Sequence, residues 1–199
     1  MLAKEARSTL QLQLQELGVT DEGLLTLLSD AARIKEVERG EIIIKTGEQP
    51  THFFMILSGL ARYYYLAHDG KEWNKAFFRE GQLIGSLSAF LTHQPCTYTI
   101  SAMEKCQLAV IPTSLFEQGT EIHPQLDRLL NSYVQLIMLR NEAREAMLLT
   151  CNSEAHYRWL MTNQEWLVRR VPQYQLASYL GVEPASLSRI KRQLGLPDS

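Results

Sequence analysis

Several features of common protein classes are scarce or missing in this sequence of 199 residues. Its three cysteines, Cys96, Cys106 and Cys151, are an odd number outside any CxxC spacing, so we expect neither a disulfide framework nor a zinc site. No window approaches the ~18 apolar residues that a membrane helix needs. The first residues mix charged and apolar side chains, unlike a signal peptide. We therefore expect a cytoplasmic protein without a membrane partner.

Clustered metal ligands are also missing. The five histidines are isolated, without an HxH pair, whereas a metal-dependent barrel enzyme of cupin type needs its ligands close together. His52, His68, His93 and His123 lie in no context that distinguishes a haem ligand. We predict that the protein is not an enzyme and holds no metal or other cofactor. The metal-dependent barrel enzyme is kept as an alternative that metal analysis can test.

A helix-turn-helix pattern occupies residues 171–194, which read VPQYQLASYLGVEPASLSRIKRQL. Its apolar positions lie three and four residues apart, as on packed helix faces, and Gly181 can supply the tight turn between two helices. Pro172 and Pro184 suit first helical turns. The polar face of the second helix lacks carboxylates and carries the predicted DNA-binding residues Ser186, Ser188, Arg189, Lys191 and Arg192. The alternative is a helical hairpin with a solvated basic face that contacts protein and not DNA.

The distribution of charge favours DNA. The whole chain has a net charge of -2, but a global sum can conceal a local patch. Residues 152–199 carry six lysines and arginines against four aspartates and glutamates. The basic excess therefore lies where contact with DNA is predicted.

Short runs typical of β-strands fill residues 34–111, after two short amphipathic helical patterns. They read EIIIK, HFFMIL, LARYYYLA, KEWNKAFF, TYTISAM and CQLAVI. Asp69-Gly70 between two of these runs predicts a hairpin. Short strands at a spacing of ~8 to 12 residues predict a barrel or jelly roll, and the helices on both sides make the fold class α+β.

Residues 125–150 contain neither glycine nor proline, which predicts one helix of ~26 residues and ~39 Å. That length suits pairing with a second copy through a seam at coiled-coil spacing. The predicted dimer interface consists of Leu126, Leu130, Tyr133, Ile137, Arg140 and Arg144. Two alternatives stay open, namely packing of the helix across its own barrel and a second register through Leu129, Tyr133, Leu136, Arg140 and Ala143.

The order of barrel, long helix and helix-turn-helix resembles the Crp/Fnr family of bacterial transcription regulators. The similarity covers nearly the whole chain and rests on Gly40, Gly47, Leu57-Ser58-Gly59, Gly81-Gln82-Leu83-Ile84-Gly85 and Arg189. It implies a cyclic-nucleotide-binding-like barrel in residues 1–116, a dimerisation helix in 117–151 and a DNA-binding domain in 152–199. The wing that follows the recognition helix in many members is expected to be absent or vestigial, because few residues follow Leu194.

The resemblance implies a homodimer that reads a palindromic operator in double-stranded DNA. Arg189 matches the arginine that family members direct at guanine, a contact worth ~1 to 3 kcal/mol of discrimination. Lys191 and Arg192 are expected to contact phosphates. Pro184 and Ala185 replace the longer polar residues of cyclic-nucleotide-responsive members, so we expect a different operator. RNA polymerase and an unidentified small-molecule effector stay open as further partners.

The effector pocket that the resemblance implies consists of Gly85, Ser86, Leu87, Cys96 and Thr97. In cyclic-nucleotide-binding members a glutamate stands at the position of Ser86, and an Arg-Ser or Arg-Thr pair stands at Cys96 and Thr97. A phosphate buried without a cation lacks charge-assisted hydrogen bonds. We therefore expect no tight binding of cyclic AMP or cyclic GMP.

Overall fold

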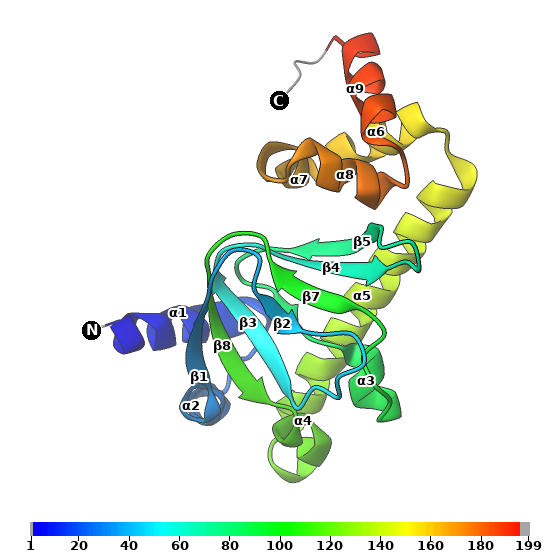
Figure 1. The fold of residues 1–199 in the computed structure, drawn as a ribbon. Helices are drawn as coiled ribbons and strands as arrows, with labels where there is room; N and C mark the ends of the chain where they lie inside the picture. The colour runs from blue at the N-terminus through cyan, green and yellow to red at the C-terminus, as the bar shows by residue number, and fades with distance from the viewer. Residues whose placement is uncertain (1, 196–199) are drawn as a thin grey trace. The chain divides into compact units, whose positions relative to one another are not determined.

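The computed structural model describes residues 2–195 (Figure 1). The first half runs α1 (Leu2–Glu16), α2 (Glu22–Ala31), β1 (Arg33–Val37), β2 (Ile42–Ile44), β3 (His52–Ser58), β4 (Ala61–Leu66), β5 (Glu72–Phe78), β6 (Leu83–Ile84) and α3 (Leu87–Thr92). The second half runs β7 (Thr99–Ala102), β8 (Cys106–Pro112), α4 (Ser114–Gln118), η1 (Gly119–Glu121), α5 (Pro124–Thr150), α6 (Ser153–Asn163), α7 (Glu165–Arg170), α8 (Gln173–Leu180) and α9 (Pro184–Gln193).

The chain divides into two compact units, at positions that differ from the predicted domain boundaries. One unit contains the described residues up to Tyr63 together with Phe78–Leu136, and we call it the barrel unit. The other contains Tyr64–Phe77 and the described residues from Ile137 onward, and we call it the helical unit. The second half of β4, all of β5 except Phe78, and the second half of α5 therefore belong to the helical unit.

The strands form two four-stranded sheets, ordered β1-β8-β3-β6 and β2-β7-β4-β5. β8 pairs antiparallel with both β1 and β3, and β2 pairs antiparallel with β7. This arrangement confirms the α+β class with an amino-terminal barrel. All six runs of the sequence pattern form strands, whereas β6, with two residues, is too short to produce a pattern. β3 is buried on both faces, because Phe53 and Met55 point to one side of the sheet and Ile56 to the other, and all three are buried.

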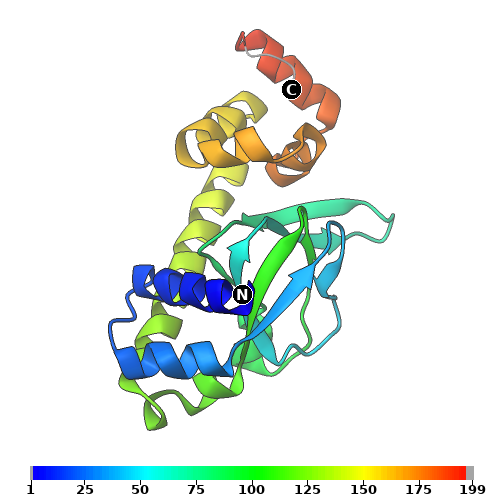
Figure 2. The same ribbon diagram turned by 90° about the vertical axis from the view of Figure 1, so that its left-hand side faces the viewer.

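The two amino-terminal helices lie side by side and cover one side of the barrel (Figure 2). α1 contacts β3, and α2 contacts β8. Asp21 caps α2, since its Oδ1 accepts a hydrogen bond of 2.8 Å from the backbone N–H of Leu24. Both helices are held in place by fully buried leucines, namely Leu10 and Leu14 of α1 and Leu24 and Leu28 of α2.

Helix α5 confirms the predicted long helix, and two residues of the predicted seam are buried within the barrel unit. Leu126 and Tyr133 are buried in the barrel unit, and the Tyr133 ring lies 6.2 Å from the ring of Phe53. Arg144 is half-buried and binds backbone carbonyls of the helical unit. The three other residues of the predicted seam, Leu130, Ile137 and Arg140, are partly exposed.

The exposed side of α5 has a seam of its own. Its residues follow one another in alternating steps of four and three, and all are exposed: Ser132, Leu136, Leu139, Ala143, Ala146 and Thr150. Leu136 and Leu139 are 53% and 60% exposed. Of the predicted alternative register, only Leu136 and Ala143 fall on this exposed seam.

Candidate DNA-binding face and barrel interior

The helical unit contains the predicted helix-turn-helix. α8 ends at Leu180, and Gly181 follows with a φ of +68°, a left-handed conformation that glycine adopts at little cost. Pro184 is the first residue of α9. The two helices pack through side chains that the apolar pattern predicted, all of them buried: Leu176, Ala177, Leu180, Leu187 and Ile190.

Helix α9 presents an arginine face to solvent. Arg189 and Arg192 are exposed and lie three residues apart, on the same face as the exposed Ala185. No carboxylate occurs between Pro184 and Gln193. The side chains of two cations are therefore free to meet an anionic partner, together with the partly exposed Ser186.

Two of the predicted contact residues are used otherwise in this structure. Lys191 is only 5% exposed, because it lies on the side of α9 that packs onto the domain, and a phosphate-contacting role does not fit this position. Ser188 Oγ accepts a hydrogen bond of 2.8 Å from Gln173 Nε2 and donates one of 3.2 Å to the carbonyl of Pro184. Ser188 therefore joins the start of α8 to α9 and holds the two helices together.

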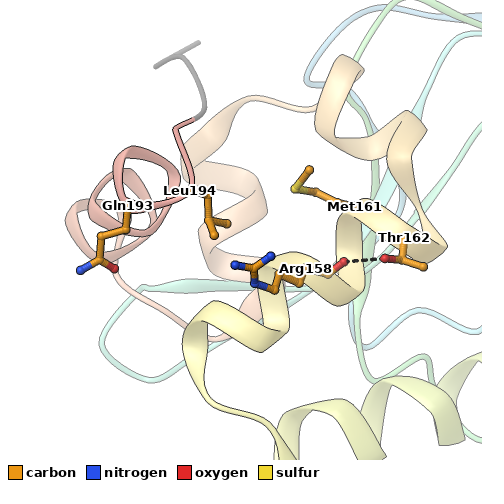
Figure 3. A pocket seen from close by; sticks show the side chains of 5 residues that line it. All are labelled: Arg158, Met161, Thr162, Gln193 and Leu194. Carbon is orange, nitrogen blue, oxygen red and sulfur yellow. Dashed lines mark hydrogen bonds between the residues drawn. The ribbon is translucent and has the colours of Figure 1, made fainter.

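A shallow pocket of ≈ 490 Å³ lies between α6 and the end of α9 (Figure 3). Met161 and Leu194 line it, and Thr162 donates a hydrogen bond to the backbone carbonyl of Arg158. The Arg158 guanidinium is paired with Glu154 at 2.9 Å. The expected absence of a wing concerns the residues after Leu194, of which 196–199 lie outside the described residues.

The β4–β5 hairpin packs on α8, a contact that sequence patterns did not indicate. Asn74 is buried, its backbone N–H donates to Ser178 Oγ at 2.9 Å, and its side-chain amide donates to the carbonyl of Gln175 at 2.9 Å. Ser178 Oγ in turn donates to the carbonyl of Glu72 at 2.8 Å. A buried asparagine with such partners fixes orientation, because buried polar groups without partners are costly.

Arg144 joins three elements of the helical unit. Its Nη2 donates to the carbonyl of Tyr179 at 2.8 Å and to the carbonyl of Asn74 at 3.2 Å. The guanidinium also lies 4.7 Å from the centre of the Tyr179 ring, a cation–π distance. Burial lowers the pKa of Arg144 below its ordinary value, and the charge of Arg140 lowers it further.

In the barrel unit, two of the predicted effector residues, Ser86 and Cys96, have partners within the chain. Ser86 is buried and caps α3, with its Oγ 3.3 Å from the backbone N–H of Ala89. The buried Cys96 thiol donates to the carbonyl of Tyr98 at 3.0 Å, and Thr97 is exposed. None of the five predicted positions contributes a cation.

Residues 34–123 match the family of the cyclic nucleotide-binding domain. This part of the chain, which includes most of the barrel, is therefore similar to that family. The chain is also 28% identical over 103 residues to Lysophospholipase nte1 of Neurospora crassa. That match covers 52% of this chain and 7% of the much longer relative, so the chain spans only a small part of the relative's length.

Solved structures match the cyclic nucleotide-binding domain together with the helices that follow it. FixK2 from Bradyrhizobium japonicum is 20% identical, with a TM-score of 0.71 over 82% of this chain and 84% of its own. A transcriptional regulator assigned to the crp/fnr family from Eubacterium rectale is 16% identical, with a TM-score of 0.69 over 88% of this chain and 83% of its own. The chain therefore has the fold of Crp/Fnr regulators, as its sequence predicted.

Among residues 2–195, no three side chains of histidine, cysteine, aspartate or glutamate come together as metal ligands would. Within the same range, no helix has the length and hydrophobicity to cross a membrane.

Proposed function

We propose that the chain is a dimeric, sequence-specific transcription regulator of the Crp/Fnr type that acts in the cytoplasm without a cyclic nucleotide. The observation that carries this proposal is the arginine face of α9, which a left-handed glycine turn presents on a packed helix-turn-helix. In such a unit the second helix enters the major groove of DNA. The likeness in fold to a transcriptional regulator supports the same function.

The two exposed arginines have different roles. Arg189 can donate two hydrogen bonds to the O6 and N7 atoms of a guanine, whereas Arg192, one turn nearer the end of α9, is suited to a phosphate. Arg189→Ala should therefore relax the sequence preference by ~1 to 3 kcal/mol and keep much of the non-specific affinity. Arg192→Ala should weaken binding to all sequences. It should also reduce the slope of the logarithm of the binding constant against the logarithm of the salt concentration by about one, the value for one phosphate contact.

The experiment is a selection of bound DNA fragments, followed by titration of the selected operator at several salt concentrations. Arg169→Ala is the matched control, because Arg169 is an exposed arginine of the same unit that pairs with Glu165 on α7. It should leave both operator preference and salt dependence unchanged. Selection of no DNA by a folded dimer, or an unchanged preference in Arg189→Ala, contradicts the proposal.

The dimer is proposed to form through the exposed seam of α5. Leucines at 136 and 139 supply apolar area, and Ala143 and Ala146 allow close approach of a second helix. Leu139→Glu places a charge in this seam and should give a monomer of 22.8 kDa in light scattering. Met138→Glu is the control, since Met138 is 56% exposed but points away from the seam. A dimer of Leu139→Glu would exclude this interface.

Cyclic nucleotides are not the proposed effector. Ser86 and the Cys96 thiol are occupied by contacts within the barrel, and neither can replace the charge-assisted contacts that a buried phosphate requires. Calorimetric titration with cyclic AMP should give no measurable heat of binding. Micromolar affinity in that titration would overturn this part of the proposal.

A further inference from the structure

The ring of Tyr63 packs between two other aromatic rings inside the barrel. Tyr63 is buried. Its ring is stacked on the ring of Tyr98, with centres 5.0 Å apart and an interplanar angle of 19°, and lies 4.4 Å from the ring of Phe78. Aromatic rings at these separations attract one another beyond the burial of their area. The three side chains thus fill the space beside the predicted effector residues.

The backbone of Gly85 both donates to and accepts from the Tyr63 hydroxyl, which also forms a hydrogen bond with the Tyr133 side chain. The N–H of Gly85 donates to the Tyr63 oxygen at 2.7 Å, and the hydroxyl donates to the carbonyl of the same glycine at 3.0 Å. The Tyr98 hydroxyl is 3.3 Å from that carbonyl and donates to it as well. A phenol hydroxyl can donate one hydrogen bond and accept another. The Tyr63 hydroxyl does both with the backbone of Gly85.

Gly85 cannot be replaced in this site. A Cβ atom at this position would lie 2.4 Å from Cδ1 of Phe53, far inside van der Waals contact. The close approach of the Gly85 backbone to the aromatic cluster therefore requires glycine. It brings the N–H and carbonyl groups within reach of the Tyr63 hydroxyl.

We propose that Gly85, Tyr98 and Phe78 form a phenol-binding site inside the barrel, and that the chain fills this site with its own Tyr63. The tyrosine is an internal ligand in the place where the predicted effector pocket lies. A barrel filled in this way is complete without a small molecule. If the proposed function holds, DNA binding therefore needs no effector in this barrel.

The chemistry of the site specifies a neutral phenol with a substituent opposite the hydroxyl. Burial raises the pKa of Tyr63 well above its ordinary value, and the neighbouring hydroxyls of Tyr133 and Tyr98 raise it further. The hydroxyl therefore stays protonated and able to donate. Toluene has nearly the shape of p-cresol without the hydroxyl, and it would leave the N–H and carbonyl of Gly85 unpaired in the interior.

The test removes the internal ligand and supplies a free one. Tyr63→Ala should lower the melting temperature, and p-cresol should raise it again, by about 5 to 10 °C at 100 times its dissociation constant. Toluene, added at the same fraction of its solubility limit as p-cresol, should raise the melting temperature much less. Wild-type protein, whose site is filled, should respond to neither compound.

Phe116→Ala is the matched control. Phe116 is also buried in the barrel unit and packs edge-on against Phe53, with ring centres 5.3 Å apart. Its removal opens an apolar space without the paired backbone groups of Gly85, so toluene should stabilise this variant at least as well as p-cresol. If toluene and p-cresol stabilise Tyr63→Ala equally, or if p-cresol does not stabilise the folded variant, the proposal is wrong.

A second variant tests the site if Tyr63→Ala does not fold. Tyr63→Phe keeps the ring and removes only the hydroxyl, so it should fold and leave the Gly85 N–H without its partner. Hydrogen exchange in peptides that cover Gly85 should become up to about tenfold faster than in wild type. Unchanged exchange in these peptides would overturn the proposal.

The consequence for DNA binding is tested separately. Dialysed wild-type protein should bind its selected operator equally well with and without a cell extract that supplies small molecules. A requirement for the extract would overturn effector-independence. Failure to bind DNA under either condition would overturn the proposed function, while the response of Tyr63→Ala to p-cresol would still decide the internal site.

Discussion

Arg144 offers the most direct test of how the helical unit is held together. Replacement by methionine keeps the apolar stem of the side chain and removes the guanidinium. Two hydrogen bonds are then lost, at 2.8 Å to the carbonyl of Tyr179 and at 3.2 Å to that of Asn74, together with the cation–π contact. The hairpin, α5 and α8 would lose the side chain that connects them.

The magnitude follows from these contacts. A hydrogen bond from a charged donor contributes about 1.5 to 3 kcal/mol, and a partly desolvated cation–π contact adds about 1 kcal/mol. The cost of burying the guanidinium, which also lowers the pKa of Arg144, offsets part of this gain. We expect Arg144→Met to destabilise the helical unit by about 2 to 4 kcal/mol.

The assay is urea unfolding followed by tryptophan fluorescence. All three tryptophans of the sequence, Trp73, Trp159 and Trp166, lie in the helical unit, so their emission reports its unfolding. Arg128→Met is the control, because Arg128 is an exposed arginine on the same helix. A midpoint for Arg144→Met equal to that of the control would refute the assigned role of Arg144.

Three further outcomes follow from single positions. Gly85→Ala should destabilise the barrel by about 2 to 4 kcal/mol, as measured by calorimetry, because its Cβ would overlap Phe53. Asn152→Ala should cost about 1 kcal/mol, since Asn152 Oδ1 caps α6 by accepting from Ala155 N–H at 2.9 Å; Asn152→Asp should retain most of this stability. The pKa of Tyr63 is raised well above 10.0, so the native state keeps a proton that the unfolded chain releases. The contribution of Tyr63 to the free energy of unfolding is complete below about pH 10 and falls as the pH rises further. In urea titrations at increasing pH, the free energy of unfolding should therefore fall less steeply for Tyr63→Phe than for the wild type.

Local patterns predicted most of the element order but not β1, β6 or α7. β-Branched and aromatic runs between turn residues predicted most of the strands that the barrel contains, and the absence of glycine and proline from residues 125–150 predicted α5 to within one residue. Gly181 and Pro184 placed the turn of the helix-turn-helix. These features depend on the backbone preferences of individual residues. Because such preferences act over a few neighbouring positions, they can be predicted from the sequence alone.

The use of each helix face was decided by tertiary structure. A repeat of apolar residues shows that a face of α5 is buried, but the same repeat suits a barrel and a second helix equally well. The structure packs Leu126 and Tyr133 inside the barrel unit and leaves Leu136 and Leu139 exposed. Similarly, Lys191 belongs to a basic stretch in the sequence, yet the packing of α9 buries it.

The sequence by itself determined that a barrel, a long helix and a helix-turn-helix follow one another, and that Arg189 stands on the polar side of the last helix. The family resemblance further predicts that Ser86 and Cys96 stand where cyclic-nucleotide-binding members hold the ribose and the phosphate. Only the tertiary structure brought Tyr63 against Gly85, 22 residues later in the chain, and Arg144 against Tyr179, 35 residues later. Contacts between such distant residues depend on how the elements pack, which the spacing of residues along the chain does not encode.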